Sequence, residues 1–144
     1  MQDRFKFRMW NKLSNEMQDV IRINYNLGTP DCSTVVAETN SFDKVKTHTM
    51  PITCANSFNN IILMQCTGLK DKNGKLIYEG DIIYKKGSKD YKKEKMYSRV
   101  CWDSMYAQFN ISDKNGMHQM TSNSNNIEVI GNIYENSELL KDNE

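Results

Sequence analysis

The glycines and acids between residues 68 and 81 have the spacing that most resembles a ligand-binding motif. Gly68 and Gly74 flank a run of Lys and Asp that resembles a phosphate-binding loop. That loop requires four residues between its glycines and a hydroxyl residue after its Lys, whereas this chain has five residues and then Leu76. A calcium loop with Gly74 at its sixth position would begin at Leu69, which offers no side-chain oxygen. Neither phosphate-loop nor calcium-loop chemistry is expected.

Catalytic and metal-binding patterns are also missing from the sequence. There is no G-x-S-x-G, and the two histidines, His48 and His118, lie far apart in polar surroundings. The four cysteines, at positions 32, 54, 66 and 101, form no C-x-x-C pair, so we expect small buried thiols rather than a disulfide or a metal site. A cysteine–histidine pair formed in space stays open, because such partners need not be neighbours in sequence. We expect no enzyme, no metal and no cofactor.

Two charged features have more than one interpretation. Glu79 and Asp81 flank Gly80. They are either turn residues with a solvated carboxylate, or side chains that contact a ligand where a strand begins. Between residues 85 and 99 seven cations face only two acids, with three tyrosines nearby, which is typical either of a solvated loop or of a nucleic-acid contact. The candidate nucleic-acid contacts are Lys85, Lys86, Lys92, Lys93, Lys95 and Arg99. The acidic tail at 128–144 offsets this basic loop, and the formal net charge of +1 argues against binding nucleic acid by bulk charge alone.

Short alternating segments separated by Gly, Asn and Asp turns predict a mostly β chain. Residues 4–10 and 17–25 are expected to form an N-terminal hairpin, with residues 4–10 as a half-buried strand. Further strands are expected at 61–66, 76–78, 82–84, 99–102, 105–111, 117–120 and 127–130. Asn136 is expected to cap a short helix that contains Leu139 and Leu140.

The fold expected from these elements is mainly β (β-rich α+β), a small SH3-like β-barrel or meander with a short C-terminal helix. With 144 residues, the chain has the length of one domain, 1–144. Residues 26–60 are polar and are expected to be a variable, loop-rich segment. No apolar run reaches the ~18 residues of a membrane span and no signal-peptide core follows Met1, so we expect no membrane association and a cytoplasmic location.

Residues 67–81, TGLKDKNGKLIYEGD, resemble the signature of the YopX family of phage and prophage proteins. Residues 6–10 resemble the opening strand of that family, and residues 129–136 with Leu139 and Leu140 resemble its closing segment. The departures are small: Cys66 stands where an aromatic residue is common, and Ser137 where Pro often opens the last helix. The resemblance covers the whole chain as one domain.

The resemblance implies an accessory protein of temperate phages, mostly β, with no catalytic residues to carry over. We therefore expect a non-catalytic binding module, a homo-oligomer in the cytoplasm of the infected or lysogenic bacterial host. It would bind a host protein or sequester a small anionic nucleotide signal of antiphage defence; the alternative is a nucleic-acid-binding accessory protein that uses the basic 85–99 loop. Most of the signature would determine the fold, and Lys70, Lys75, Glu79 and Asp81 would stay exposed. The candidate ligand or partner surface is Arg8, Trp10, Lys70, Lys75, Glu79, Asp81, Asn132 and Tyr134.

Overall fold

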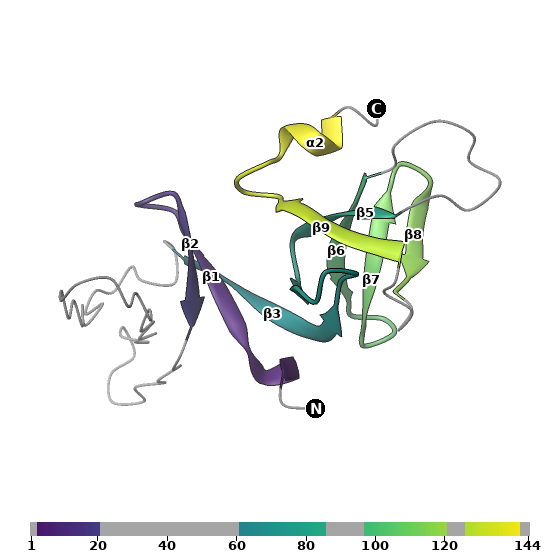
Figure 1. The fold of residues 1–144 in the computed structure, drawn as a ribbon, viewed down its shortest axis with the longest axis horizontal. Helices are drawn as coiled ribbons and strands as arrows, with labels where there is room; N and C mark the ends of the chain where they lie inside the picture. The colour runs from purple at the N-terminus through teal and green to yellow at the C-terminus, as the bar shows by residue number, and fades with distance from the viewer. Residues whose placement is uncertain (1–2, 21–60, 86–96, 121–125, 142–144) are drawn as a thin grey trace. The chain divides into compact units, whose positions relative to one another are not determined.

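The computed structural model describes residues 3–20, 61–85, 97–120 and 126–141, and they form two compact units (Figure 1). One unit comprises residues 6–65, and the other comprises residues 66–144 with the first five residues of the chain. Every strand pair is antiparallel. The described helices are the 3₁₀ turn η1 (Asp3–Phe5) and α2 (Glu138–Lys141). The expected mainly β fold with a short C-terminal helix is confirmed, whereas the SH3-like barrel and the single domain 1–144 stay predictions.

The N-terminal hairpin is confirmed over the residues described. Strands β1 (Phe7–Asn11) and β2 (Glu16–Val20) pair in register, and the Asn11 side chain accepts hydrogen bonds from the backbone N–H of Leu13 (2.9 Å) and Ser14 (3.3 Å). Asn15 closes the turn with a φ of 55°, a conformation that Asn tolerates better than most residues. The first half of β3 (Ile61–Lys70) pairs on the other side of β1.

Strand β1 differs from the expected half-buried strand in two ways. It starts at Phe7, because the residues just before it form η1 instead of extended chain. Its three central residues, Arg8, Met9 and Trp10, are all buried, so the expected alternation of buried and exposed faces is wrong. One reason is that β1 is a central strand, so side chains of both neighbouring strands shield it; the Arg8 guanidinium, for example, lies 3.8 Å from the Met64 sulfur of β3.

The second unit holds a five-stranded sheet in the order β8-β7-β6-β5-β9. Its strands are β5 (Asp81–Lys85), β6 (Tyr97–Asp103), β7 (Gln108–Asp113), β8 (Gly116–Gln119) and β9 (Ile127–Asn132). The second half of β3 pairs with the short strand β4 (Leu76–Tyr78). No described helix is long and apolar enough to cross a membrane.

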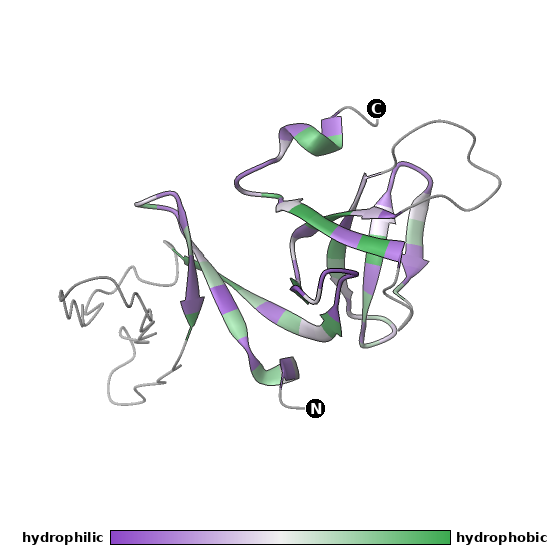
Figure 2. Cartoon of the chain, viewed as in Figure 1, coloured by the Kyte–Doolittle hydropathy of each residue, from purple (hydrophilic) through white to green (hydrophobic). Residues whose placement is uncertain are grey.

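The core of this unit collects alternate residues from several strands, as expected for a sheet with one buried face. Its buried members are Ile77, Ile83, Val100, Ile111, Ile127 and Val129. Strand β9 shows the pattern, because Ile127 and Val129 are buried and Glu128 between them is only partly buried. Figure 2 shows hydrophobic and hydrophilic segments following one another along this strand. Leu69, Phe109 and Met120 pack against this core while keeping part of their surface in solvent.

One expected strand was too long at its start. Residues 105–107 were expected to continue into the strand that ends at Ile111, and this expectation is wrong because residues 104–107 form the turn between β6 and β7. The Asp103 carboxylate accepts hydrogen bonds from the backbone N–H of Met105 (2.9 Å) and Tyr106 (3.3 Å), and Ala107 takes a positive φ of 50°. The turn leaves Met105 82% exposed and Tyr106 68% exposed.

The loop after β9 depends on a close approach at Gly131. Asn136, expected to cap α2 with its side chain, instead accepts a hydrogen bond from Asn132 N–H through Oδ1 (3.3 Å). Its backbone carbonyl accepts the hydrogen bond from Leu139 N–H, at 3.1 Å. A Cβ atom at Gly131 would lie 2.8 Å from Cγ and 2.9 Å from Cβ of Asn136, so only glycine fits there.

Gly131→Ala should therefore destabilise the protein by about 1–3 kcal/mol, the usual cost of overpacking. Chemical denaturation followed by circular dichroism measures the loss. The matched double variant Gly131→Ala/Asn136→Gly removes the side chain that the new methyl group meets. It should be more stable than the sum of the two single changes predicts, and strict additivity would contradict the proposed contact.

Candidate functional site

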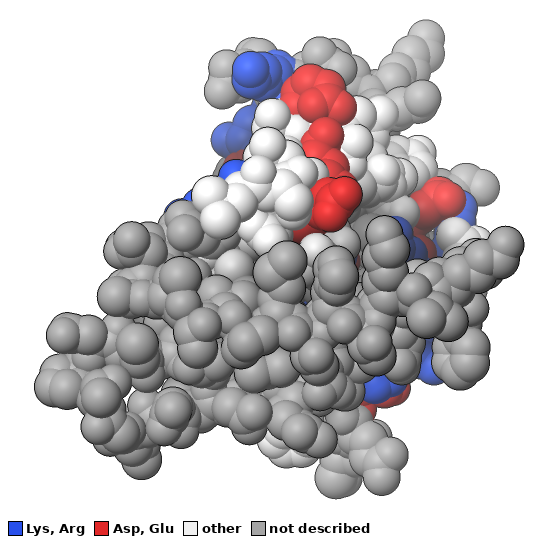
Figure 3. All heavy atoms as spheres, turned by 90° about the vertical axis from the view of Figure 1, so that its left-hand side faces the viewer, with Lys and Arg blue, Asp and Glu red and all other residues white. Residues whose placement is uncertain are grey.

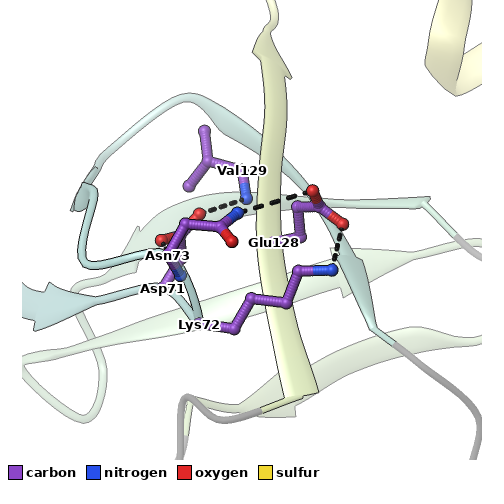
Figure 4. A network of polar contacts seen from close by, with 5 residues as sticks. All are labelled: Asp71, Lys72, Asn73, Glu128 and Val129. Atoms are coloured by element: carbon purple, nitrogen blue, oxygen red, sulfur yellow. Dashed lines mark hydrogen bonds and ion pairs between the residues drawn. The ribbon is translucent and has the colours of Figure 1, made fainter.

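The turn at residues 71–75 lies between β3 and β4, within the YopX-like signature, and is called the signature turn below. It is organised by the carboxylate of Asp71, which is buried (Figure 4). Its Oδ1 accepts hydrogen bonds from Asn73 N–H (2.8 Å) and Lys75 N–H (2.9 Å) of its own turn. Its Oδ2 accepts one from Val129 N–H of β9 at 3.1 Å, 58 residues along the chain. One side chain therefore shapes the turn and fastens it to the last strand.

The pKa of Asp71 is set by two opposing effects. Burial raises the pKa, but the hydrogen bonds from the backbone of Val129, Lys75 and Asn73 outweigh it, with help from the Lys75 charge. The result is a pKa below the ordinary value of 3.8, so the carboxylate stays ionised. A carboxylate that accepts several backbone N–H bonds is a structural acceptor already in use, and it leaves little capacity for a ligand.

The same turn covers the outer edge of β9 with further contacts. Lys72 N–H donates to the Ile127 carbonyl (2.9 Å), and the Lys72 ammonium forms an ion pair with Glu128 at 2.6 Å. The Asn73 amide donates to the other Glu128 oxygen at 3.5 Å, and the hydrogen bond from Lys72 lowers the pKa of Glu128 (Figure 4). The turn takes the place of a neighbouring strand beside β9.

Two candidate site residues of the second unit are buried. Asp81 was expected to be exposed, and this is wrong: it is 0% exposed, and its Oδ2 accepts a hydrogen bond from Tyr78 N–H at 2.7 Å. The physical reason is the turn at Gly80, whose φ of 76° folds the carboxylate back onto the backbone before β5. Asn132 is also buried, and its Oδ1 accepts hydrogen bonds from Tyr134 N–H and Glu135 N–H, both at 3.0 Å.

The remaining candidates are not gathered into one site by any described contact. Lys70 and Lys75 are exposed, and Glu79 and Tyr134 are partly buried, all in the second unit. Arg8 and Trp10 are buried in the other unit. Whether these residues contact a ligand stays a prediction.

The candidate nucleic-acid contacts are only partly described. Lys85 and Arg99 are exposed, whereas Lys86, Lys92, Lys93 and Lys95 lie outside the described residues. On the face drawn in Figure 3, the described cations form small separate groups, and several of them lie next to described acids. The described part of that face therefore has no continuous basic surface.

A pocket of about 300 Å³ lies where the core of the second unit meets solvent, and the sequence did not predict it. Its lining is Thr67, Leu69, Trp102, Ala107, Gln108, Phe109 and Met120. Trp102 and Phe109 are opposite each other in the β6–β7 register, and their rings meet edge to face at a centroid distance of 5.0 Å. Trp102 nevertheless stays 44% exposed, so a large aromatic surface forms part of the pocket wall.

The chemistry of the pocket favours an uncharged occupant. None of the described residues that line it is an Asp, Glu, Lys, Arg or His. The Thr67 hydroxyl already donates to the Ile77 carbonyl (2.9 Å) and accepts from Leu69 N–H (3.1 Å). The available sequence signal was that Trp102 lies two residues after Val100, which places both side chains on the same face of a strand. That pattern predicts a buried core residue rather than a residue in a pocket wall.

A Ser–Asp–His cluster in the second unit lacks the order that nucleophilic catalysis requires. Ser98 Oγ donates to Asp113 Oδ2 at 3.4 Å, and His118 Nε2 lies 3.4 Å from Asp113 Oδ1. Catalysis needs the imidazole between the hydroxyl and the acid, whereas here the acid is in the middle. The arrangement ties β8 and β6 to β7.

The two described cysteines also lack the features of a reactive thiol. Cys66 is buried, and Cys101 donates to the Asn110 carbonyl at 3.7 Å. Burial raises the pKa of the Cys101 thiol, the opposite of what a nucleophilic cysteine needs. The described residues contain no group of three His, Cys, Asp or Glu side chains placed to hold a metal ion. That the protein is not an enzyme stays a prediction.

The fold and its signature turn agree with what comparison with known proteins finds. The family model described as YopX protein matches residues 6–141, so the chain belongs to the YopX family. Among solved structures, protein EF1440 from Enterococcus faecalis is similar, with 28% identity, a TM-score of 0.56, and coverage of 94% of this chain and 96% of that one. Protein yopX from Bacillus subtilis has the same TM-score at 21% identity, with coverage of 95% and 96%. The search of curated proteins found no match.

Asp71→Asn should destabilise the protein by about 1.5–3 kcal/mol at pH 7, because the amide N–H₂ would face the Val129 N–H and the charge would be lost. Since folding lowers the pKa of Asp71, its stabilisation is fully present above the ordinary value of 3.8 and is lost as the pH falls through the folded value. The difference in the free energy of unfolding between wild type and variant, measured by urea denaturation, should therefore shrink below about pH 4.

Glu128→Gln is the matched control, because it alters the exposed ion pair of the same network. Its effect at pH 7 should be much smaller than that of Asp71→Asn. Equal losses of unfolding free energy for the two variants would contradict the assigned role of Asp71. So would a loss for Asp71→Asn that does not change with pH.

Proposed function

We propose that this YopX protein is a non-catalytic accessory protein of a phage or prophage that binds a host protein in the bacterial cytoplasm. The observation that carries the proposal is the uncharged pocket walled by Trp102 and Phe109, beside a turn that exposes Met105 and Tyr106. Trp, Tyr and Met are residue types enriched at the centres of protein interfaces.

Several features support a protein over a small anion as the ligand. A nucleotide needs cations or converging N–H groups at its phosphates, and none of the described residues that line the pocket is charged. In the signature turn, the N–H groups of Asn73 and Lys75 already donate to the Asp71 carboxylate, so they are not available to an anion. A partner that covers Trp102 would also bury an aromatic surface that the fold leaves in water.

Trp102→Ala should weaken binding of a host protein about 30-fold or more, the usual effect of truncating a central interface aromatic. The tagged full chain is incubated with host lysate, the retained protein is identified and purified, and its Kd is measured by calorimetry for wild type and variant. Leu13→Ala, at an exposed position 75% accessible in the other unit, is the matched control and should bind as wild type does.

Retention of a nucleotide with no protein above background would contradict the proposal, as would equal Kd values for wild type and Trp102→Ala. Circular dichroism checks that the Trp102→Ala variant is folded. Light scattering on the same samples measures the molar mass, and the expected homo-oligomer stays a prediction until then.

A further inference from the structure

We infer that the partner is bound as an added β-strand along β8, with one large apolar side chain in the Trp102–Phe109 pocket. This inference rests on the proposed function and names how the partner is recognised. It follows from two observations. Described contacts close the β9 edge of the five-stranded sheet but not its β8 edge, and the pocket lies at the end of β8.

The β9 edge is closed by the protein itself. Val129 N–H donates to the Asp71 carboxylate and the Ile127 carbonyl accepts from Lys72 N–H, so two outward-facing backbone groups of β9 are already paired. Beyond them, Asn136 packs on Gly131 and accepts from Asn132 N–H. A foreign strand would have to displace this turn and loop.

The β8 edge has no such closure among the described residues, where β8 pairs only with β7. All four of its residues, Gly116 to Gln119, are exposed. Sheets usually protect an edge with Lys, Pro or a bulge, whereas β8 carries no Lys or Pro and pairs in continuous register. Alternate N–H and C=O groups of an edge strand point away from the sheet and can pair with an extended segment.

The pocket adjoins this edge. Gln119, the last residue of β8, pairs with Asn110, and the next residue, Met120, lines the pocket beside Phe109. Side chains of an added strand alternate between the two faces, about 6.5–7 Å apart on one face. A strand laid along β8 and past Gln119 therefore brings one of its side chains beside Met120, at the near side of the pocket.

The partner that fits is an extended, uncharged segment with a Leu, Met or Phe at the anchor position. The four residues of β8 and the described residues that line the pocket include no acid or permanent cation, although a quarter of this chain is charged. A charged anchor would lose its hydration without gaining an opposite charge. Backbone pairing supplies affinity in such complexes, and the anchor pocket supplies selectivity.

The probe is a ten-residue peptide selected from a random display library against the full chain, with Trp102→Ala used for counter-selection. Two N-methylated versions test the backbone pairing: one is methylated on odd residues and the other on even residues outside the anchor. In an added strand only one of the two sets of N–H groups faces β8. One version should bind at least tenfold more weakly while the other keeps its affinity, and NMR shifts should map to the amides of residues 116–120.

Equal effects of the two N-methylated peptides, shifts confined to other strands, or failure to select any peptide would overturn the inference. A dimer in which β8 of a second copy occupies this edge would also overturn it. Such a dimer would have twice the molar mass, and its β8 amides would be protected from hydrogen exchange in the absence of peptide. If Trp102→Ala abolishes host-protein binding but N-methylation shows no alternation, the proposed function stands and the added strand is wrong. If Trp102→Ala leaves host-protein binding unchanged, the proposed function fails first.

Discussion

The fold of the second unit depends on one buried carboxylate that takes up backbone N–H groups of two distant segments. Asp71 joins Asn73 and Lys75 of its own turn to Val129 of the last strand. A buried N–H without an acceptor costs about 1–3 kcal/mol, so the turn and β9 cannot separate without exposing these groups to water. The central part of the YopX signature and its closing segment are thus two halves of one hydrogen-bonded arrangement.

Two further polar residues of the matched segments act on the backbone in the same way as Asp71. The acid Asp81 and the amide Asn132 also point inward, onto the backbone N–H groups of Tyr78, Tyr134 and Glu135. The two aspartates of the segment that resembles a binding motif, Asp71 and Asp81, therefore accept hydrogen bonds from the backbone. The partner surface that we propose comprises the pocket at the end of the core and the β8 edge beside it, and none of its described side chains is an acid, a Lys or an Arg.

The candidate site shows how far sequence reasoning reaches. The exposure of Lys70 and Lys75 follows from their place in a Lys- and Asn-rich turn. The burial of Asp81 could not be read from its neighbours, because it depends on the exact bend at Gly80. Trp102 shares the parity of the core, and its exposure depends on how far the surrounding strands extend over it.

By itself the sequence determined the mainly β class, most of the turns and described strands, and the family signature. These properties are local, because alternation and Asn, Gly and Asp turns act over a few residues. Only the tertiary structure decided which acids are buried, that the turn closes the edge of β9, and that a pocket opens beside Trp102. The reason is distance along the chain: the contact between Asp71 and Val129 joins residues 58 positions apart, and no local pattern encodes which partner a turn will meet.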